Sequence, residues 1–231
     1  MFISKERFKK LVKDSYKHGG LVVGQTEKGI LIVGGHNWQL EIDSECMYKT
    51  HLAAVIECTG YIPKPGEAVK FFESEKECVE QNELIDTAYL DLFSAWAERA
   101  NDKGCKYAFT RVILASADGY QWVMQNQTVA QEKCLMYDRI AMMIDFKNLD
   151  HEKGENTPVF ASRANDCFMY FGNNMMVLMV KKWSPMYEGE VNLMQKLCEV
   201  NALYSTEYCK RNYKKIENAL QKAAIRNGKL I

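Results

Sequence analysis

Residues 27–72 read EKGILIVGGHNWQLEIDSECMYKTHLAAVIECTGYIPKPGEAVKFF, and the rest of the chain is interpreted outward from them. The turn Glu27-Lys28-Gly29 leads into a run from Ile30 to Ile42 that is rich in aliphatic residues, which predicts one long strand. A helix is predicted from Thr50 to Gly60, because apolar residues recur there at helical spacing and a glycine ends the run. Two prolines follow, and Ala68–Phe72 returns as a strand.

The polar patch at residues 34–37, Gly34-Gly35-His36-Asn37, interrupts the predicted long strand. Paired glycines inside a strand often mark a bulge, so the patch is interpreted as a bulge, with a ligand-binding loop as the alternative.

The same order of parts occurs again about ninety residues later. There a turn at residues 117–119 precedes a predicted strand over 120–133, a helix over 138–146 and a strand over 158–161. Three pairs of landmarks keep offsets of 90, 89 and 88 residues: Gly29 and Gly119, Tyr48 and Tyr137, and Gly66 and Gly154. Such a steady offset indicates an internal duplication.

An amphipathic helix is predicted before each copy. The first begins at Lys5 with Ser4 as its cap, and the second covers residues 86–101. Further strands are predicted at 21–25, 107–115, 167–171 and 175–183. The alternation of apolar and polar residues in the strands favours antiparallel sheets with helices on one face, an α+β fold. We expect two repeated helix-hairpin-helix-strand units, residues 1–80 and 83–185, and a helical tail at 186–231 that is mainly helical over 190–227.

Composition excludes several classes of protein. No apolar run reaches the length of a membrane span, and the first residues lack the apolar core of a signal peptide, so we expect a cytoplasmic protein without a membrane partner. The eight cysteines include no C-x-x-C pair, which indicates reduced thiols rather than disulfides or metal ligands. We therefore expect no metal and no cofactor.

Charge is unevenly distributed although the net charge is zero. Residues 4–18 carry six basic and two acidic side chains, a net +4, residues 208–231 carry +6 and residues 67–91 carry −6. Such asymmetry can mark a polyanion-binding face, and a solvated helix surface is the alternative. The candidate DNA-binding residues share the first predicted helix: Lys5, Lys9, Lys10, Lys13 and Lys17.

The sequence contains none of the common phosphate-loop, dinucleotide, zinc-protease or serine-hydrolase motifs. The best enzymatic alternative is a thiol–imidazole pair formed by Cys46 and His51, which lie five residues apart at a predicted helix start. That spacing is poor for a catalytic dyad, so we expect a protein that is not an enzyme.

The order of elements resembles the DNA polymerase sliding clamps, the bacterial beta subunit and its two-domain relatives. The resemblance covers residues 1–183 and rests on segments that look like clamp segments: Lys28–Val33, Leu52–Glu67, Thr157–Phe160 and Val177–Val180. The sequence departs from the clamp pattern in two ways. Val180 stands where clamps have a proline, and the predicted helix over residues 86–101 is not basic.

The resemblance implies a clamp-like accessory protein of DNA replication, such as a processivity factor of a phage or mobile element. It implies duplex DNA, a polymerase or another replication protein, and further copies of this chain as partners. The alternatives are a clamp-fold module that binds only proteins, and an unrecognised enzyme.

Overall fold

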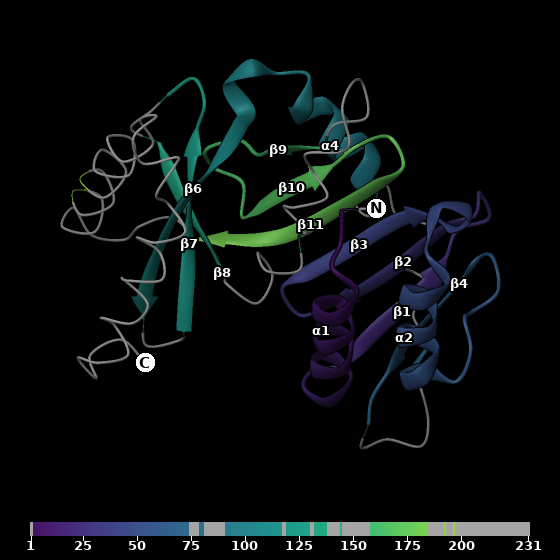
Figure 1. Cartoon of the computed structure of the whole chain (residues 1–231). Helices are drawn as coiled ribbons and strands as arrows, with labels where there is room; N and C mark the ends of the chain where they lie inside the picture. Colours follow the sequence, from purple (N-terminus) through teal and green to yellow (C-terminus); the bar gives the residue numbers. More distant parts are fainter. Residues whose placement is uncertain are drawn as a thin grey trace.

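The computed structural model describes residues 2–73, 79–80, 91–116, 119–129, 132–137, 144, 158–183, 192 and 196. Within these ranges, three α-helices accompany one 11-stranded antiparallel sheet (Figure 1). The strand order is β10-β9-β6-β7-β8-β11-β3-β2-β1-β4-β5. No helix in these ranges is long and apolar enough to cross a membrane.

Residues 2–80 form what we call the first half. Its elements are α1 (Lys5–Lys17), β1 (Leu21–Gln25), β2 (Ile30–Gly35), β3 (Trp38–Asp43), a 3-10 turn (Ser44–Cys46), α2 (Lys49–Thr59), β4 (Glu67–Phe71) and β5 (Val79–Glu80). Ser4 precedes α1 as predicted, but its side chain makes no capping hydrogen bond.

The predicted single strand from Ile30 to Ile42 is wrong, because the chain reverses at residues 36–37. β2 and β3 pair from Ile30 opposite Asp43 to Gly35 opposite Trp38, so the patch is a hairpin turn rather than a bulge. A Cβ atom on Gly35 would lie 2.2 Å from Ser15 Oγ of α1. The glycine therefore serves the close approach of a helix to the sheet.

Residues 91–183 form the second half. Its elements are α4 (Leu92–Ala100), a 3-10 turn (Lys103–Cys105), β6 (Lys106–Ser116), β7 (Gly119–Asn126), β8 (Lys133–Tyr137), β9 (Val159–Ala161), β10 (Phe168–Gly172) and β11 (Met176–Trp183). The β10–β11 hairpin confirms the two predicted strands at 167–171 and 175–183.

The predicted strand over 120–133 is also wrong, because it comprises β7, a turn and the start of β8. The turn follows from Asn126, whose Oδ1 accepts the backbone N–H of Thr128 at 2.8 Å and of Val129 at 2.9 Å. Ile144 is the one described residue of the predicted helix over 138–146, and it forms an isolated antiparallel β-bridge with Ile3. The rest of that helix, nearly all of the predicted tail and the start of the predicted helix over 86–101 lie outside the described residues.

Each half has the same strand order. It is β4-β1-β2-β3 in the first and β9-β6-β7-β8 in the second. A duplication requires this shared order, and the duplication itself stays a prediction.

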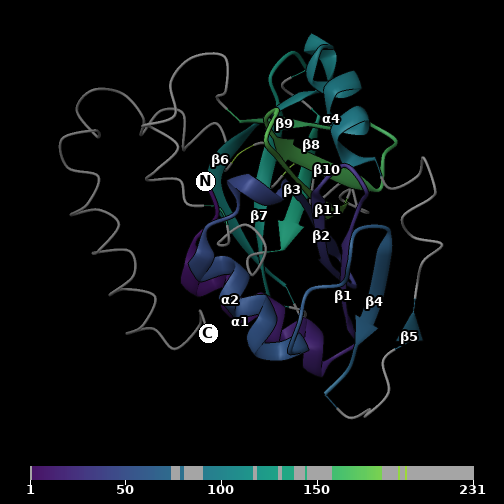
Figure 2. The same cartoon turned by 90° about the vertical axis from the view of Figure 1, so that its right-hand side faces the viewer.

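Strand β11 joins the halves (Figures 1 and 2). Met176–Val180 pair with β3, and Lys182 and Trp183 pair with β8. The opposite edge of β11 pairs with β10 from Val177 to Lys181. The second half therefore closes on itself through β11, β10, β9, β6, β7 and β8, whereas the first half extends from β11 as an open sheet.

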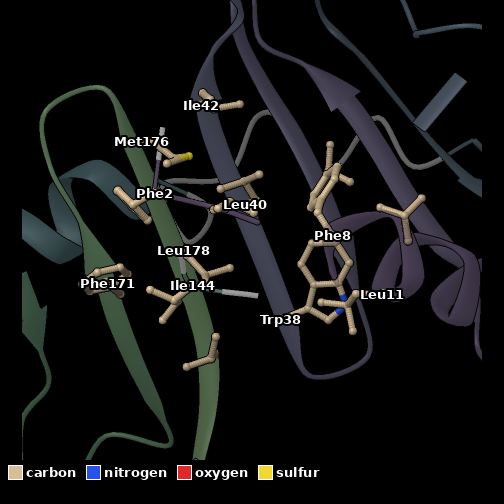
Figure 3. Packing of buried hydrophobic residues seen from close by; sticks show 14 of the residues in the cluster. Phe2, Phe8, Leu11, Trp38, Leu40, Ile42, Ile144, Phe171, Met176 and Leu178 are labelled. Carbon is tan, nitrogen blue, oxygen red and sulfur yellow. The ribbon is translucent and has the colours of Figure 1, made fainter. Parts of the chain in front are cut away.

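One large hydrophobic cluster runs through both halves (Figure 3). Phe2 lies between them and meets Phe171 edge-on, with ring centroids 4.6 Å apart. Alternate residues of β11 serve different clusters: Leu178 belongs to the large one, and Val177 packs with Leu92 of α4. Thus α1 packs within the large cluster, whereas α4 lies on the other side of β11.

Candidate nucleic-acid interface

Helices α1 and α2 lie side by side on the open sheet of the first half (Figure 2). Phe8, Leu11 and Val12 bury one side of α1 in the large cluster, as the helical spacing predicts. Ala54 and Val55 do the same for α2, and His51 is buried on the same helix. The opposite sides of both helices face solvent, so any charge on them is available to a partner.

All five candidate lysines lie on α1. Lys5, Lys10, Lys13 and Lys17 are exposed and Lys9 is half-buried. The helix has six basic and two acidic side chains, a net +4 over 13 residues. The structure thus brings the predicted lysines together on one helix.

Three of these lysines face carboxylates. Lys9 Nζ lies 2.7 Å from Glu57 Oε2 of α2, and Lys13 Nζ lies 3.6 Å from the same oxygen. Lys17 Nζ lies 3.6 Å from Glu73 Oε1, just after β4. The hydrogen bond from Lys9 lowers the pKa of Glu57, so this carboxylate is charged at neutral pH.

Lys5 and Lys10 differ from these three. No ion pair joins either of them to an acidic side chain in the part of the chain that the structure describes. They are the lysines of α1 best able to accept an external anion without giving up an internal one.

Sequence reasoning missed Glu57 and Glu73. Glu57 lies 48 residues from Lys9 and meets it only because α1 and α2 pack together. The one signal in the sequence was an acidic residue on the exposed side of a predicted helix, which does not specify its partner.

Exposed apolar side chains occur on and next to α2. Tyr48, Ile56 and Tyr61 are 54%, 38% and 51% exposed. Large apolar side chains therefore contact water around α2, whereas the exposed side of α1 is mainly charged.

The alternative enzymatic pair is not formed. His51 Nε2 lies 3.0 Å from the carbonyl oxygen of Ile3, and burial lowers the pKa of His51. The Cys46 thiol instead points to the thioether of Met175, with the sulfur atoms 3.7 Å apart. Each side chain thus has a different partner, and His51 is a neutral structural histidine.

The described residues include no group of three or more histidine, cysteine or acidic side chains arranged to hold a metal ion. The cysteines whose state the structure gives are free thiols: Cys46, Cys58, Cys105, Cys134 and Cys167.

No family model and no curated protein matches the chain. Among solved structures, it is similar to the Helicobacter pylori beta clamp in complex with 5-chloroisatin, with 10% identity over 80% of this chain and 63% of that one and a TM-score of 0.34. A putative DNA polymerase III beta subunit from Eubacterium rectale gives 9% identity, coverage of 83% and 66%, and a TM-score of 0.36.

The Helicobacter pylori beta clamp bound to a DNA ligase peptide gives 10% identity, coverage of 80% and 66%, and a TM-score of 0.34. The chain spans less than two thirds of each of these proteins. The similarity is remote, and the function has to be argued from the residues of this chain.

Proposed function

We propose that the chain is a non-enzymatic accessory protein of DNA replication that binds duplex DNA through α1. The observation that carries the proposal is the concentration of Lys5, Lys9, Lys10, Lys13 and Lys17 on one helix whose other side is buried. A phosphate backbone relieves the mutual repulsion of these side chains, and such binding needs no sequence-specific contact. Further copies of this chain and a polymerase or another replication protein are the proposed protein partners.

A protein-binding module without DNA affinity is the second candidate. The exposed side chains of Tyr48, Ile56 and Tyr61 favour it, because aromatic and aliphatic residues are the usual anchors of protein interfaces. In this alternative, the basic side of α1 meets an acidic protein surface.

The test is the salt dependence of binding to a fluorescently labelled duplex, measured by anisotropy. Four effective phosphate contacts give a log–log slope of roughly −3 to −4 between binding constant and salt concentration. We choose Lys5→Glu with Lys10→Glu as the variant, because reversing Lys9 or Lys13 would add repulsion with Glu57 within the protein. The double variant should bind at least about tenfold more weakly, with a slope about two units shallower.

The matched control is Lys64→Glu with Lys103→Glu, which makes the same change in charge at exposed positions outside α1. It should bind nearly as well as the unmodified protein. If the unmodified protein does not bind duplex DNA at low salt, the DNA proposal fails and the protein-binding candidate replaces it.

A further inference from the structure

Lys9 and Lys13 lie one helical turn apart and converge on a single carboxylate oxygen. Their Nζ atoms are 2.7 and 3.6 Å from Glu57 Oε2, and Lys9 also donates to Oε1 at 2.8 Å. One anionic group is therefore already held between two ammonium groups on the surface where we place the DNA.

A phosphodiester group offers these ammonium groups the same chemistry, a negatively charged oxygen that accepts hydrogen bonds. The three side chains are 38%, 49% and 47% exposed, so a phosphate can reach the ammonium groups from solvent. Exposed ion pairs of this kind are weak, because water and salt screen them. An incoming phosphate can therefore take the place of Glu57 without disturbing the core.

We infer that Lys9 and Lys13 form a phosphate subsite and that Glu57 occupies it in the free protein as a built-in competitor. The inference rests on the proposed function, since it concerns the same helix and the same ligand. Glu57 thereby limits the affinity of α1 for DNA and keeps two of its five lysines engaged until a phosphate arrives.

A second carboxylate has a similar place at the end of α1. Glu73 Oε1 lies 3.6 Å from Lys17 Nζ. It faces one lysine rather than two, so its removal should affect DNA binding less than removal of Glu57. This difference gives an order of effects that a general change in net charge would not produce.

The experiment compares Glu57→Gln, Glu73→Gln and the unmodified protein on the same labelled duplex over a series of salt concentrations. Glutamine keeps the size of the side chain and removes the charge. Glu57→Gln should tighten binding roughly three- to tenfold at low salt, because no internal carboxylate has to be displaced, and the gain should shrink as salt rises, because salt screens the ion pairs of Glu57. Glu73→Gln should have a smaller effect in the same direction.

The matched control is Glu27→Gln, an exposed glutamate in the β1–β2 turn with the same change in charge. It should change binding less than about twofold. In a second comparison, Glu57→Gln is added to a Lys9→Gln, Lys13→Gln background, where it should have no more effect than Glu27→Gln, because the subsite is gone. Circular dichroism confirms that each variant is folded.

The two proposals fail in different ways. Absence of DNA binding by the unmodified protein at low salt overturns the proposed function, and this inference with it. Salt-dependent binding by the unmodified protein, with Glu57→Gln no tighter than Glu27→Gln, overturns the inference alone.

Discussion

The two halves of the molecule share a strand order and use it differently. In the first half, β3-β2-β1-β4 continues to β5 and remains an open sheet. In the second half, the corresponding series β8-β7-β6-β9 continues to β10, and β11 pairs with both of its ends. A single strand placed between two ends is enough to turn an open sheet into a closed one.

This difference determines where helices are needed. Strands of the closed half supply much of their own core, with Met124, Phe160 and Phe171 buried in the large cluster. An open sheet has no facing strands, so α1 and α2 must cover it with Phe8, Leu11 and Val55. The helix that carries the exposed basic side chains, α1, is part of this covering layer. The basic surface therefore lies on the first half.

Charged groups are also distributed differently. On the helical layer of the first half, lysines and glutamates pair at the surface. In the second half, Lys182 is buried and its ammonium group donates to the carbonyl oxygens of Arg163 and Ala164. The second half also has an exposed ion pair, Arg163 with Glu98, so the halves differ in this buried lysine and in the net charge of +4 on α1 rather than in the presence of surface pairs.

The largest expected effect comes from breaking the strand that the halves share. Leu178 of β11 is fully buried in the large cluster and pairs with Leu40 of β3. Leu178→Ala should lower the free energy of unfolding by about 2–5 kcal/mol, because it removes buried methyl groups and leaves a cavity. Urea unfolding should show one transition at lower denaturant, since both halves depend on β11.

The control is Met175→Ala, just before β11, where the side chain is 41% exposed and the loss should stay within about 0.5 kcal/mol. Two separate transitions in Leu178→Ala, one of them unchanged, would show that the halves fold independently.

A second prediction concerns Glu41, which links β3 to α4. Its carboxyl group is buried, and Oε2 accepts the backbone N–H of Leu92 at 3.0 Å. Burial raises the pKa of Glu41 to about 8, and the charge of Asp91 adds to this effect. The folded protein thus holds a proton that the unfolded chain has released, so the free energy of unfolding falls as pH rises from about 4.5 to about 8.

Glu41→Gln keeps the acceptor and removes the titration. Relative to the unmodified protein, the variant should gain about 1–3 kcal/mol in free energy of unfolding between pH 5 and pH 9. Urea unfolding at matched pH measures this difference. His51, whose pKa is lowered, reduces stability in acid in both proteins and therefore cancels. A difference that is constant with pH would contradict the prediction.

The sequence predicted the elements that depend on local pattern. Helical spacing located α1 and α2, and the predicted strands at 167–171 and 175–183 correspond to β10 and β11. It also placed the five lysines together on one helix, α1. These features follow from residues that are neighbours in the chain, so a single sequence contains them.

The remaining features depend on contacts between distant residues. The turn at His36-Asn37 lacks the glycine that usually marks a two-residue hairpin, and the glycines before it serve α1 instead. The closure by β11 and the pairing of Glu57 with Lys9 require the folded arrangement, because nothing in the local pattern specifies either partner.

The smallest expected effect comes from removing one serine hydroxyl from α1 in the first half and, for comparison, one from α4 in the second half. Trp38 is buried in β3, and its Nε1 donates to Ser15 Oγ of α1 at 3.1 Å. Ser15→Ala leaves that indole N–H buried without its acceptor, so the free energy of unfolding should fall by about 1–2 kcal/mol. Ser94→Ala is the matched change on α4, where the hydroxyl is exposed and the backbone N–H of Ser94 keeps its bond to Asp91 Oδ1. Its cost should stay below about 0.5 kcal/mol. Urea unfolding followed by circular dichroism measures both variants, and equal losses would mean that the Ser15–Trp38 bond does not anchor α1 to the open sheet.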